Sequence, residues 1–432
     1  MTAPALTDIP LVARIPGSKS ITNRALLLAA AADGVSCLRA PLVSDDTVAF
    51  REALTALGVG VRATPHDEFW EVDGVGRGPS AGSAAVWCAD AGTAARFLPP
   101  FAAAGHGSYL FDGTDQLRAR PLRPLLEALA RLGAVTRSEG EGDLPLRIEA
   151  AGLDGGELAV DGGMSSQFLS GLLMAAPLLR SDLTVTVRDL VSRPYIDMTT
   201  ALMRRFGARL TEGPPGVFHL SAGGYTAADL VIEPDASTAS YVFAAAAVTG
   251  RTVTVPGLGR DSLQGDLGFV EVLRTAGARV EIGEQSTTVT GTGGLRGGFD
   301  VDMGEISDTF MTLAAIAPLA DAPITVHGIA HARLKESDRI EAMARNLAAC
   351  GVRTESGPDR ITVHPGRVRP ARIACHRDHR IAMAFSVLGL AAPGLTFDDP
   401  ACVAKTFPGF HAELHRLFPE HAPAADPQTA AP

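Results

Sequence analysis

The residues best suited to bind an anion lie near the start of the chain, in the segment 16–24, PGSKSITNR. This segment runs directly into the apolar block 25–32, ALLLAAAA, which predicts a helix. A helix that begins after a turn presents free backbone N–H groups and the positive end of its dipole to a ligand. Lys19, Ser20 and Arg24 fall within the first turn and a half, so one oxyanion can contact all three. A capped helix with exposed basic residues explains the stretch equally well, and the residues alone leave both interpretations open.

Length and composition narrow the class of protein. A chain of 432 residues exceeds one ordinary core and predicts two domains or one large repetitive assembly. Hydrophobic residues make up 46% and charged residues 20%, as in globular soluble proteins, and the net charge of −10 argues against a nucleic-acid partner. The apolar runs are too short to cross a bilayer, and the N-terminal MTAPALTDIP lacks the regions of a signal peptide, so no membrane partner is expected.

Cysteine and histidine usage indicates the compartment and the absence of a metal. The five cysteines are scattered, odd in number and without a CxxC pair: Cys37, Cys88, Cys350, Cys375 and Cys402. This usage predicts a cytoplasmic protein without a zinc site. His376 and His379 lie three residues apart, but no third ligand accompanies them, so no metal is expected.

An amphipathic helix that ends in a glycine recurs along the chain at spacings of 70 to 75 residues. The glycines are Gly58, Gly133, Gly207, Gly277 and Gly351, and HAELHRLF (411–418) supplies a sixth helix. Each glycine is predicted in the left-handed conformation that ends a helix. The period predicts six copies of one β/α unit of about 70 residues.

A second set of helices follows the same period. Each is Ala-rich, apolar nearly all round and preceded by a polar cluster, as in DAGTAAR before FLPPFAAAG and HRDHR before IAMAFSVLGLAA. Such helices must be buried. Short β-branched runs between the helices, such as LTVTV and RTVTV, predict strands. Two groups of three copies, with a break near residues 230–235, would direct six helix N-termini at a shared anion-attracting site, and the chain start is expected to pair with the second half.

The polar clusters combine many cations with few carboxylates, which suits a substrate with several phosphate or carboxylate groups. The cations are Lys19, Arg24, Arg96, Arg120, Arg193, Lys335, Arg339, Arg380 and Lys405. The neutral donors are Ser20, Thr93, Ser165, Ser166, Gln167, Ser192 and Tyr195. The carboxylates are Asp45, Asp46, Asp90, Asp235, Asp308, Glu336 and Asp338. Single members are ambiguous: Arg96 and Arg193 can equally form salt bridges between copies, and Asp235 can cap a helix.

Eight segments, from about residue 15 to about residue 417, resemble those of the EPSP synthase family (3-phosphoshikimate 1-carboxyvinyltransferases, among the enolpyruvyl transferases). In order they are PGSKSITNRALLLAA, DAGTAARFL, RARPLRPLLEAL, SSQFLSGLLMAAP, SRPYIDM, KESDR, DHRIAMAFS and AKTFPGF. The resemblance implies an α/β protein, a two-domain inside-out α/β barrel built from six βαβαββ repeats. Residues 16–232 would hold repeats one to three, residues 1–15 with 233–421 would hold repeats four to six, and 422–432 is expected to be a disordered tail.

The resemblance also implies the reaction. The enolpyruvyl group of phosphoenolpyruvate moves to the 5-hydroxyl of shikimate 3-phosphate through a tetrahedral intermediate, with release of phosphate and without a cofactor. A monomer is expected, since the reaction needs only one chain. Adding an alcohol to an enol ether needs a base at the hydroxyl and a proton at one carbon, so two separate carboxyl groups are appropriate.

Residue by residue, the resemblance implies three sets. The ligands of shikimate 3-phosphate are Lys19, Ser20, Arg24, Ser165, Ser166, Gln167, Ser192, Tyr195, Asp308, His331 and Lys335. The ligands of phosphoenolpyruvate are Lys19, Gly92, Arg120, Gln167, Arg339, Arg380 and Lys405. The catalytic residues are Asp308, which takes the 5-hydroxyl proton, Glu336, which handles the proton at the methylene carbon, and Lys19.

Three positions depart from the pattern of the family. Asp90 and His331 stand where the family commonly has Asn, and Phe97 stands where it has Pro. These changes are either neutral drift or a retuning of acceptor choice or of sensitivity to glyphosate, the competitor of phosphoenolpyruvate in this family. Gly92, as in sensitive forms, is retained.

The residues bear differently on three alternative functions. A sister enzyme acting on UDP-N-acetylglucosamine would need Asn in place of Ser20 and a Cys before Arg120, and residues 112–120 have none. A catalytically dead binding or scaffold protein is disfavoured, because the residues matched to proton transfer and to the cation cluster are intact. A paralogue acting on another phosphorylated cyclic alcohol stays open because of the three departures.

Overall fold

The computed structural model describes residues 10–64, 66, 68–140, 142–161 and 165–420. The tail 422–432, expected to be disordered, lies outside the described residues. The chain divides into two compact units. The N-terminal unit is Pro16–Glu233, and the C-terminal unit joins the residues that precede Pro16 to the chain from Pro234 onward.

The N-terminal unit contains three copies of one pattern of strands and helices. The first copy comprises β13 (Tyr225–Thr226), β14 (Leu230–Val231), α1 (Lys19–Ala31), β2 (Ala32–Arg39), α2 (Asp45–Ala56), β3 (Gly60–Ala63) and β4 (Phe69–Val75). The second comprises β5 (Ser83–Trp87), α3 (Gly92–Ala104), β6 (His106–Asp112), α4 (Asp115–Arg118), α5 (Arg123–Arg131), β7 (Val135–Ser138) and β8 (Leu146–Ala151). The third comprises β9 (Gly156–Asp161), α6 (Ser166–Ala175), η2 (Ala176–Leu178), β10 (Leu183–Arg188), α7 (Arg193–Arg205), β11 (Leu210–Glu212) and β12 (Val217–Leu220).

The C-terminal unit repeats the pattern. Its first copy comprises β1 (Leu11–Val12), α8 (Ala236–Thr249), β15 (Thr252–Pro256), η3 (Gly265–Gly268), α9 (Phe269–Thr275), β16 (Arg279–Ile282) and β17 (Ser286–Thr290). The second comprises β18 (Phe299–Asp302), η4 (Gly304–Ile306), α10 (Phe310–Ile316), η5 (Ala317–Leu319), β19 (Ile324–His327), η6 (Ala330–Leu334), α11 (Arg339–Ala349), β20 (Thr354–Ser356) and β21 (Ile361–Val363). The third comprises β22 (Ala371–Ile373), α12 (His379–Ala391), β23 (Leu395–Phe397), η7 (Pro400–Lys405) and α13 (Phe410–Leu417), with a sheet of two strands in the described part of the chain.

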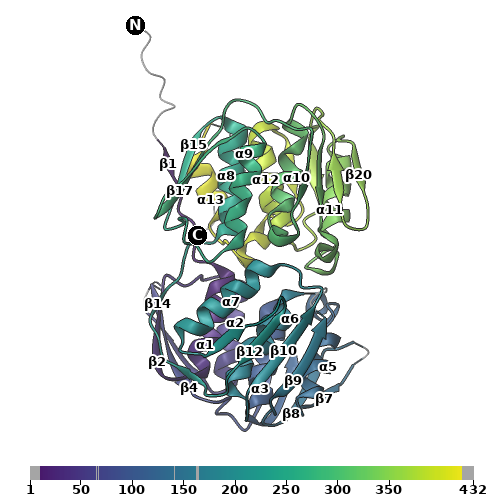
Figure 1. Cartoon of the computed structure of the whole chain (residues 1–432). Coiled ribbons are helices and arrows are strands. Elements are labelled where there is room, and N and C mark those ends of the chain that lie inside the picture. The colour runs from purple at the N-terminus through teal and green to yellow at the C-terminus, as the bar shows by residue number, and fades with distance from the viewer. Residues whose placement is uncertain (1–9, 65, 67, 141, 162–164, 421–432) are drawn as a thin grey trace. The chain divides into compact units, whose positions relative to one another are not determined.

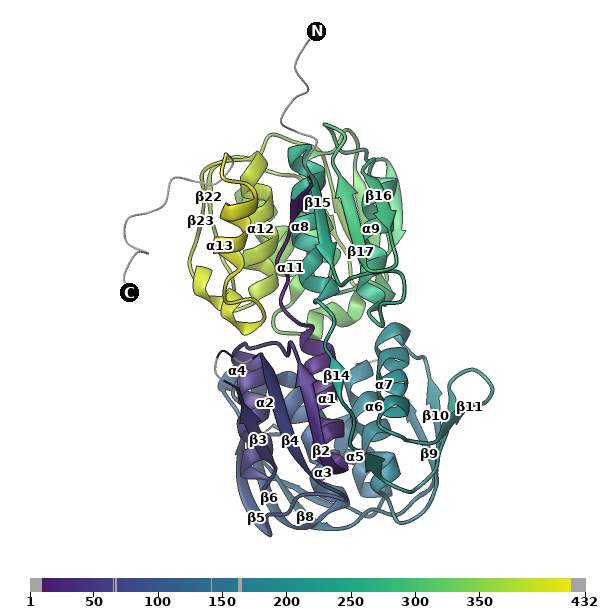
Figure 2. The ribbon, with the colours of Figure 1, turned by 90° about the vertical axis from the view of Figure 1, so that its left-hand side faces the viewer.

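Each four-stranded sheet has the same topology. In the third copy β9 runs parallel to β10, β10 antiparallel to β12, and β12 antiparallel to β11. Two copies borrow their first strand from elsewhere in the sequence. Leu11 of β1 pairs with Val253 of β15, as expected for the chain start (Figure 2), and Leu230 of β14 pairs with Leu38 of β2.

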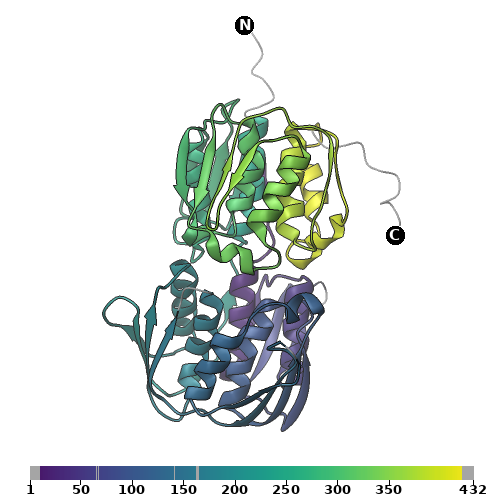
Figure 3. The ribbon, with the colours of Figure 1, turned by 90° about the vertical axis from the view of Figure 1, so that its right-hand side faces the viewer.

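The helices predicted to be apolar all round form the interior of each unit. Every residue of α3 is buried, and α8 is buried from Ala236 to Ala247. In the C-terminal unit β15 and β17 lie on one side of α8, α10 and α12, and β20 lies on the other (Figure 1). The strands of the N-terminal unit likewise lie outside its helices (Figure 3). The predicted α/β class with buried helices is therefore confirmed.

The glycines that end the amphipathic helices adopt the predicted backbone conformation. Their φ angles are positive, at 88° for Gly58, 94° for Gly133, 83° for Gly207, 98° for Gly277 and 76° for Gly351. A side chain at these angles would be strained, which explains the choice of glycine. None of the helices in the described ranges combines the length and hydropathy that crossing a membrane requires.

Candidate active site

The polar clusters of the sequence lie at the starts of the buried helices. Ser18 caps α1 by accepting from the N–H of Ile21, and Ser165 caps α6 by accepting from the N–H of Gln167 at 3.3 Å. Lys19 opens α1, and its Nζ lies 3.1 Å from a carboxylate oxygen of Asp46 in α2. The local signals of the sequence therefore place these groups at positive helix ends, as predicted.

Arg24 of α1 forms hydrogen bonds with residues of three helices, α1, α6 and α7. Its Nε donates to the Thr199 hydroxyl at 2.7 Å, and its Nη2 donates to the Ser170 hydroxyl at 3.1 Å. Its Nη1 donates to the Ser20 carbonyl at 3.0 Å, and the Tyr195 carbonyl accepts from Nη2 at 3.4 Å. All these acceptors are neutral, and Arg24 forms no ion pair with any carboxylate in the described ranges. Burial lowers the pKa of Arg24 to about 10, which leaves a buried cation that an anionic ligand would stabilise.

The start of α7 is held in an unusual conformation. Ser192 precedes α7 with φ 54° and ψ 49°, a left-handed backbone that is uncommon for serine. Such conformations concentrate at ligand sites, where the surrounding structure stabilises them. In α6 the buried Oε1 of Gln167 has no hydrogen-bond partner among the described residues. A buried amide oxygen without a partner is typical of a ligand-binding site.

Gly92 lies close to the guanidinium groups of Arg96 and Arg120. A Cβ built on Gly92 would lie 2.6 Å from Nη1 of Arg120 and 2.6 Å from Nη1 of Arg96. Arg96 donates to the Gly92 carbonyl at 3.1 Å, and both arginines are buried. The predicted residues Gly92 and Arg120 therefore lie side by side, and Arg96 joins them.

Arg193, one of the cations considered as possible substrate-binding groups, forms salt bridges instead. It forms ion pairs with Asp197 at 2.7 Å and with Glu212 at 2.6 Å. Both partners belong to its own copy, so the salt-bridge interpretation holds, but within one copy rather than between copies. Asp235 accepts from the N–H of Thr238 at 2.7 Å, which confirms the helix-cap interpretation.

In the C-terminal unit three cations surround one carboxylate. Asp308 lies 2.5 Å from Lys335, 3.0 Å from Arg339 and 2.8 Å from Arg380. Burial acts to raise the pKa of Asp308, but Arg380, Lys335 and Arg339 outweigh it and hold the pKa well below its usual value. The carboxylate of Asp308 is therefore ionised and in contact with three cations.

A fifth residue, Asp378, organises this cluster and was missed in the sequence. Its fully buried carboxylate accepts from Arg339 Nε at 2.8 Å, from the Ser337 hydroxyl at 2.9 Å and from the N–H of Arg380 at 3.1 Å. Arg339 in turn donates to Glu336 at 2.7 Å. The signal was present in the cluster HRDHR before the apolar helix, where Asp378 is the cap.

His331 and Lys405 are the remaining predicted site residues of the C-terminal unit. The Nε2 of His331 lies 2.8 Å from the Ser307 hydroxyl, which also accepts from Lys335 at 3.1 Å. Burial lowers the pKa of His331 to about 4, so its imidazole is neutral at pH 7. Lys405 is buried at the end of η7, which packs on α12.

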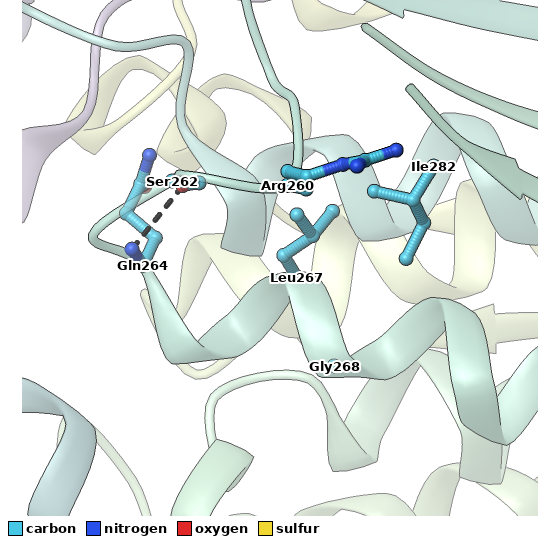
Figure 4. A pocket seen from close by; sticks show the side chains of 6 residues that line it. All are labelled: Arg260, Ser262, Gln264, Leu267, Gly268 and Ile282. Carbon is cyan, nitrogen blue, oxygen red and sulfur yellow. Dashed lines mark hydrogen bonds between the residues drawn. The ribbon is translucent and has the colours of Figure 1, made fainter. Parts of the chain in front are cut away.

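A separate hollow of about 470 Å³ lies in the same unit (Figure 4). Its lining comprises Arg260, Ser262, Gln264, Leu267, Gly268 and Ile282, none of which the sequence assigned to the reaction. Gln264 accepts from the N–H of Ala236 at 2.9 Å and so holds the start of α8. Across the described part of the chain, no three His, Cys, Asp or Glu residues are grouped to hold a metal ion.

Known proteins resemble this chain over nearly its whole length. The profile of the EPSP synthase family (3-phosphoshikimate 1-carboxyvinyltransferase) matches residues 8–414. A 3-phosphoshikimate 1-carboxyvinyltransferase of Nostoc punctiforme (strain ATCC 29133 / PCC 73102) is 42% identical over 96% of this chain and 98% of its own. That of Yersinia ruckeri is 42% identical over 93% of this chain and 95% of its own.

Solved structures share the fold. EPSP synthase from Acinetobacter baumannii superposes with a TM-score of 0.76 at 26% identity, over 94% of this chain and 95% of that chain. The enolpyruvyl transferase NikO from Streptomyces tendae gives a TM-score of 0.77 at 20% identity, over 95% of each chain, and so shows a common fold. The chain therefore belongs to the EPSP synthase family.

Proposed function

We propose that this protein transfers the enolpyruvyl group of phosphoenolpyruvate to the 5-hydroxyl of shikimate 3-phosphate, with release of phosphate. Family membership over nearly the whole chain supports the reaction. The observation that carries it is the contact of the Asp308 carboxylate with Lys335, Arg339 and Arg380. A base next to fixed cations suits an addition between two anionic substrates.

The residues of the N-terminal unit supply most of the ligands for shikimate 3-phosphate. The buried Arg24, with neutral hydrogen-bond acceptors, supplies a charge that a phosphate would complement. The proposed ligands are Lys19, Ser20, Arg24, Ser165, Ser166, Gln167, Ser192 and Tyr195, with Asp308, His331 and Lys335 from the C-terminal unit.

Most of the ligands that we propose for phosphoenolpyruvate are cations. Arg339 and Arg380 are held in place by Asp378, so that little ordering is needed when the anion binds. The proposed ligands are Lys19, Gly92, Arg120, Gln167, Arg339, Arg380 and Lys405.

The proton steps follow from the two carboxyl groups. Asp308 takes the proton of the 5-hydroxyl as its oxygen bonds to C2 of phosphoenolpyruvate, and Glu336 gives a proton to the methylene carbon. In the tetrahedral intermediate, that carbon, now a methyl group, returns a proton to Glu336, and the C=C bond re-forms as the C2–O bond to phosphate breaks. The low pKa of Asp308 makes it a weak base beside three cations. An anionic substrate on Arg339 and Arg380 offsets their charge and thereby raises the basicity of Asp308.

The oligomeric state and the compartment are also part of the proposal. We propose a monomer in the cytoplasm, where the five free cysteines remain reduced. Light scattering of the protein as it elutes from a size-exclusion column tests whether it is a monomer. A mass of about twice 44.8 kDa contradicts the monomer.

Phosphate release tests the proposed function. The protein is mixed with phosphoenolpyruvate and either shikimate 3-phosphate, shikimate or UDP-N-acetylglucosamine. We expect phosphate release when shikimate 3-phosphate is the acceptor and none with the other two acceptors. No release with any acceptor, from a protein that still binds phosphoenolpyruvate, contradicts it and directs the search to other phosphorylated cyclic alcohols.

Replacing Gly92 with alanine is expected to raise the KM for phosphoenolpyruvate by about tenfold. The new methyl group lies too close to the guanidinium ends of Arg120 and Arg96, which must move away from the position that binds the anion. The Gly389→Ala variant is the control, because a Cβ on Gly389 of α12 meets no atom within 4 Å. Steady-state kinetics of both variants test this, and an equal KM in the two contradicts the assignment of Gly92.

A further inference from the structure

The guanidinium of Arg24 lies over an aromatic ring. Its central carbon is 5.1 Å from the ring centroid of Phe97 in α3. Phe97 is completely buried, and its ring packs edge-on against Phe50 of α2, with centroids 6.4 Å apart and an interplanar angle of 73°. The ring is therefore fixed between the cation of α1 and an aromatic side chain of α2.

The hydrogen bonds of Arg24 leave its charge uncompensated. Its acceptors are two hydroxyl groups and two carbonyl groups, and one N–H of Nη1 has no partner among the described residues. A buried cation without a counter-ion is costly, and a carboxylate is the usual remedy. A carboxylate would, however, cancel the charge that an anionic ligand needs. The negative face of an aromatic ring stabilises a cation without adding a negative charge.

The same arrangement recurs in the next copy. Arg96 of α3 lies over the ring of Phe168 in α6, with its central carbon 5.4 Å from the ring centroid. In both cases the arginine near the start of one buried helix contacts a phenylalanine on the neighbouring buried helix. A contact that repeats between copies is a feature of the architecture rather than an accident of one site.

We propose that Phe97 is a positioning residue for Arg24, whose ring fixes the guanidinium and stabilises its charge so that the cation remains available to a phosphate-bearing acceptor. This inference rests on the proposed function, in which Arg24 binds shikimate 3-phosphate. Phe97 acts only through Arg24 and does not contact the reacting atoms.

The test compares Phe97→Leu with Phe101→Leu. Phe101 lies one turn further along α3, is equally buried and contacts no cation among the described residues. Both variants lose a buried ring, but only Phe97→Leu loses the contact with Arg24. Calorimetric titration with shikimate 3-phosphate is expected to show a Kd about tenfold higher for Phe97→Leu and within twofold of wild type for Phe101→Leu. The kcat at saturating substrate is expected to stay within twofold in both.

A second measurement does not depend on the substrate. In the nitrogen-15 spectrum, the Nε–H proton of Arg24 is expected at high field because of the Phe97 ring, and to exchange slowly with water. Phe97→Leu should move this signal downfield, leaving the smaller effect of the Tyr195 ring at 6.0 Å, and should speed exchange, whereas Phe101→Leu should do neither. Arg24→Lys identifies the signal, and Phe97→Met replaces the leucine variant if that variant does not fold.

The outcomes separate this inference from the proposed function. Wild-type protein that neither binds nor uses shikimate 3-phosphate refutes the proposed function. It also refutes the expected effect of Phe97 on the binding of shikimate 3-phosphate. An unchanged Kd for Phe97→Leu, or equal increases in both variants, overturns the inference while the function stands. An unchanged Nε–H signal in Phe97→Leu overturns it in either case.

Discussion

Asp308→Asn is expected to lower kcat by about 10²- to 10⁴-fold, the usual contribution of a general base. The affinity for phosphoenolpyruvate is expected to be retained or to increase. Asparagine keeps the size of the side chain but cannot take the proton of the 5-hydroxyl. It also removes the negative charge that competes with the substrate for Lys335, Arg339 and Arg380.

The increase in affinity can be measured without the reaction. Inorganic phosphate, titrated calorimetrically, is expected to bind Asp308→Asn more tightly than it binds the wild type. Three cations that share one internal carboxylate become available to the added anion once that carboxylate is neutral. A weaker affinity for phosphate would show that Asp308 stabilises the arrangement of the cations rather than competing for them.

The control for Asp308→Asn is Asp300→Asn. Asp300 lies on β18 with an exposed side chain, so this variant makes the same change of net charge away from the cluster. Its kcat and its phosphate affinity are expected to match those of the wild type. Equal losses of kcat and of substrate affinity in Asp308→Asn would contradict the role of Asp308 as the base.

Much of this architecture could be predicted because its signals are local. The helix-ending glycines, such as Gly58 and Gly351, and the serine caps, such as Ser18, act within one turn of the chain. The apolar, Ala-rich sequences that follow the caps can only form buried helices, so their positions also followed from composition. The period then joined these local signals into six copies.

The contacts inside the clusters could not be predicted in the same way. Asp308 meets Arg380, which lies 72 residues further along the chain, because α10 and α12 pack together. Asp378 meets Arg339 across 39 residues, and nothing in the spacing distinguishes that pairing from other Asp–Arg pairs. Arg193, by contrast, pairs with Asp197 at i,i+4, a spacing that the sequence displays. The salt bridge of Arg193 was thus foreseeable, whereas the place of Asp378 was not.

Arg339→Lys is expected to raise the Kd for phosphoenolpyruvate by about tenfold or more, roughly 1.4 kcal/mol. Arginine uses its whole fork in this protein: Nε donates to Asp378, Nη2 to Glu336 and Nη1 lies 3.0 Å from Asp308. Lysine brings one ammonium point charge to the same place and cannot hold three carboxylates in this geometry.

The same substitution tests whether the hydrogen bond of Arg339 to the buried Asp378 carboxylate contributes to the free energy of unfolding. Both Arg339 and Asp378 are almost fully buried, at 1% and 0% exposure, so a lost charge-assisted hydrogen bond costs about 1.5–3 kcal/mol of unfolding free energy. Arg345→Lys is the control on the same helix, since Arg345 is exposed and its ion pair with Glu341 contributes little. Denaturant unfolding and titration with phosphoenolpyruvate are measured on both variants. An Arg339→Lys protein with wild-type stability and affinity would show that charge alone suffices at this position, because the geometry of the fork would then be dispensable.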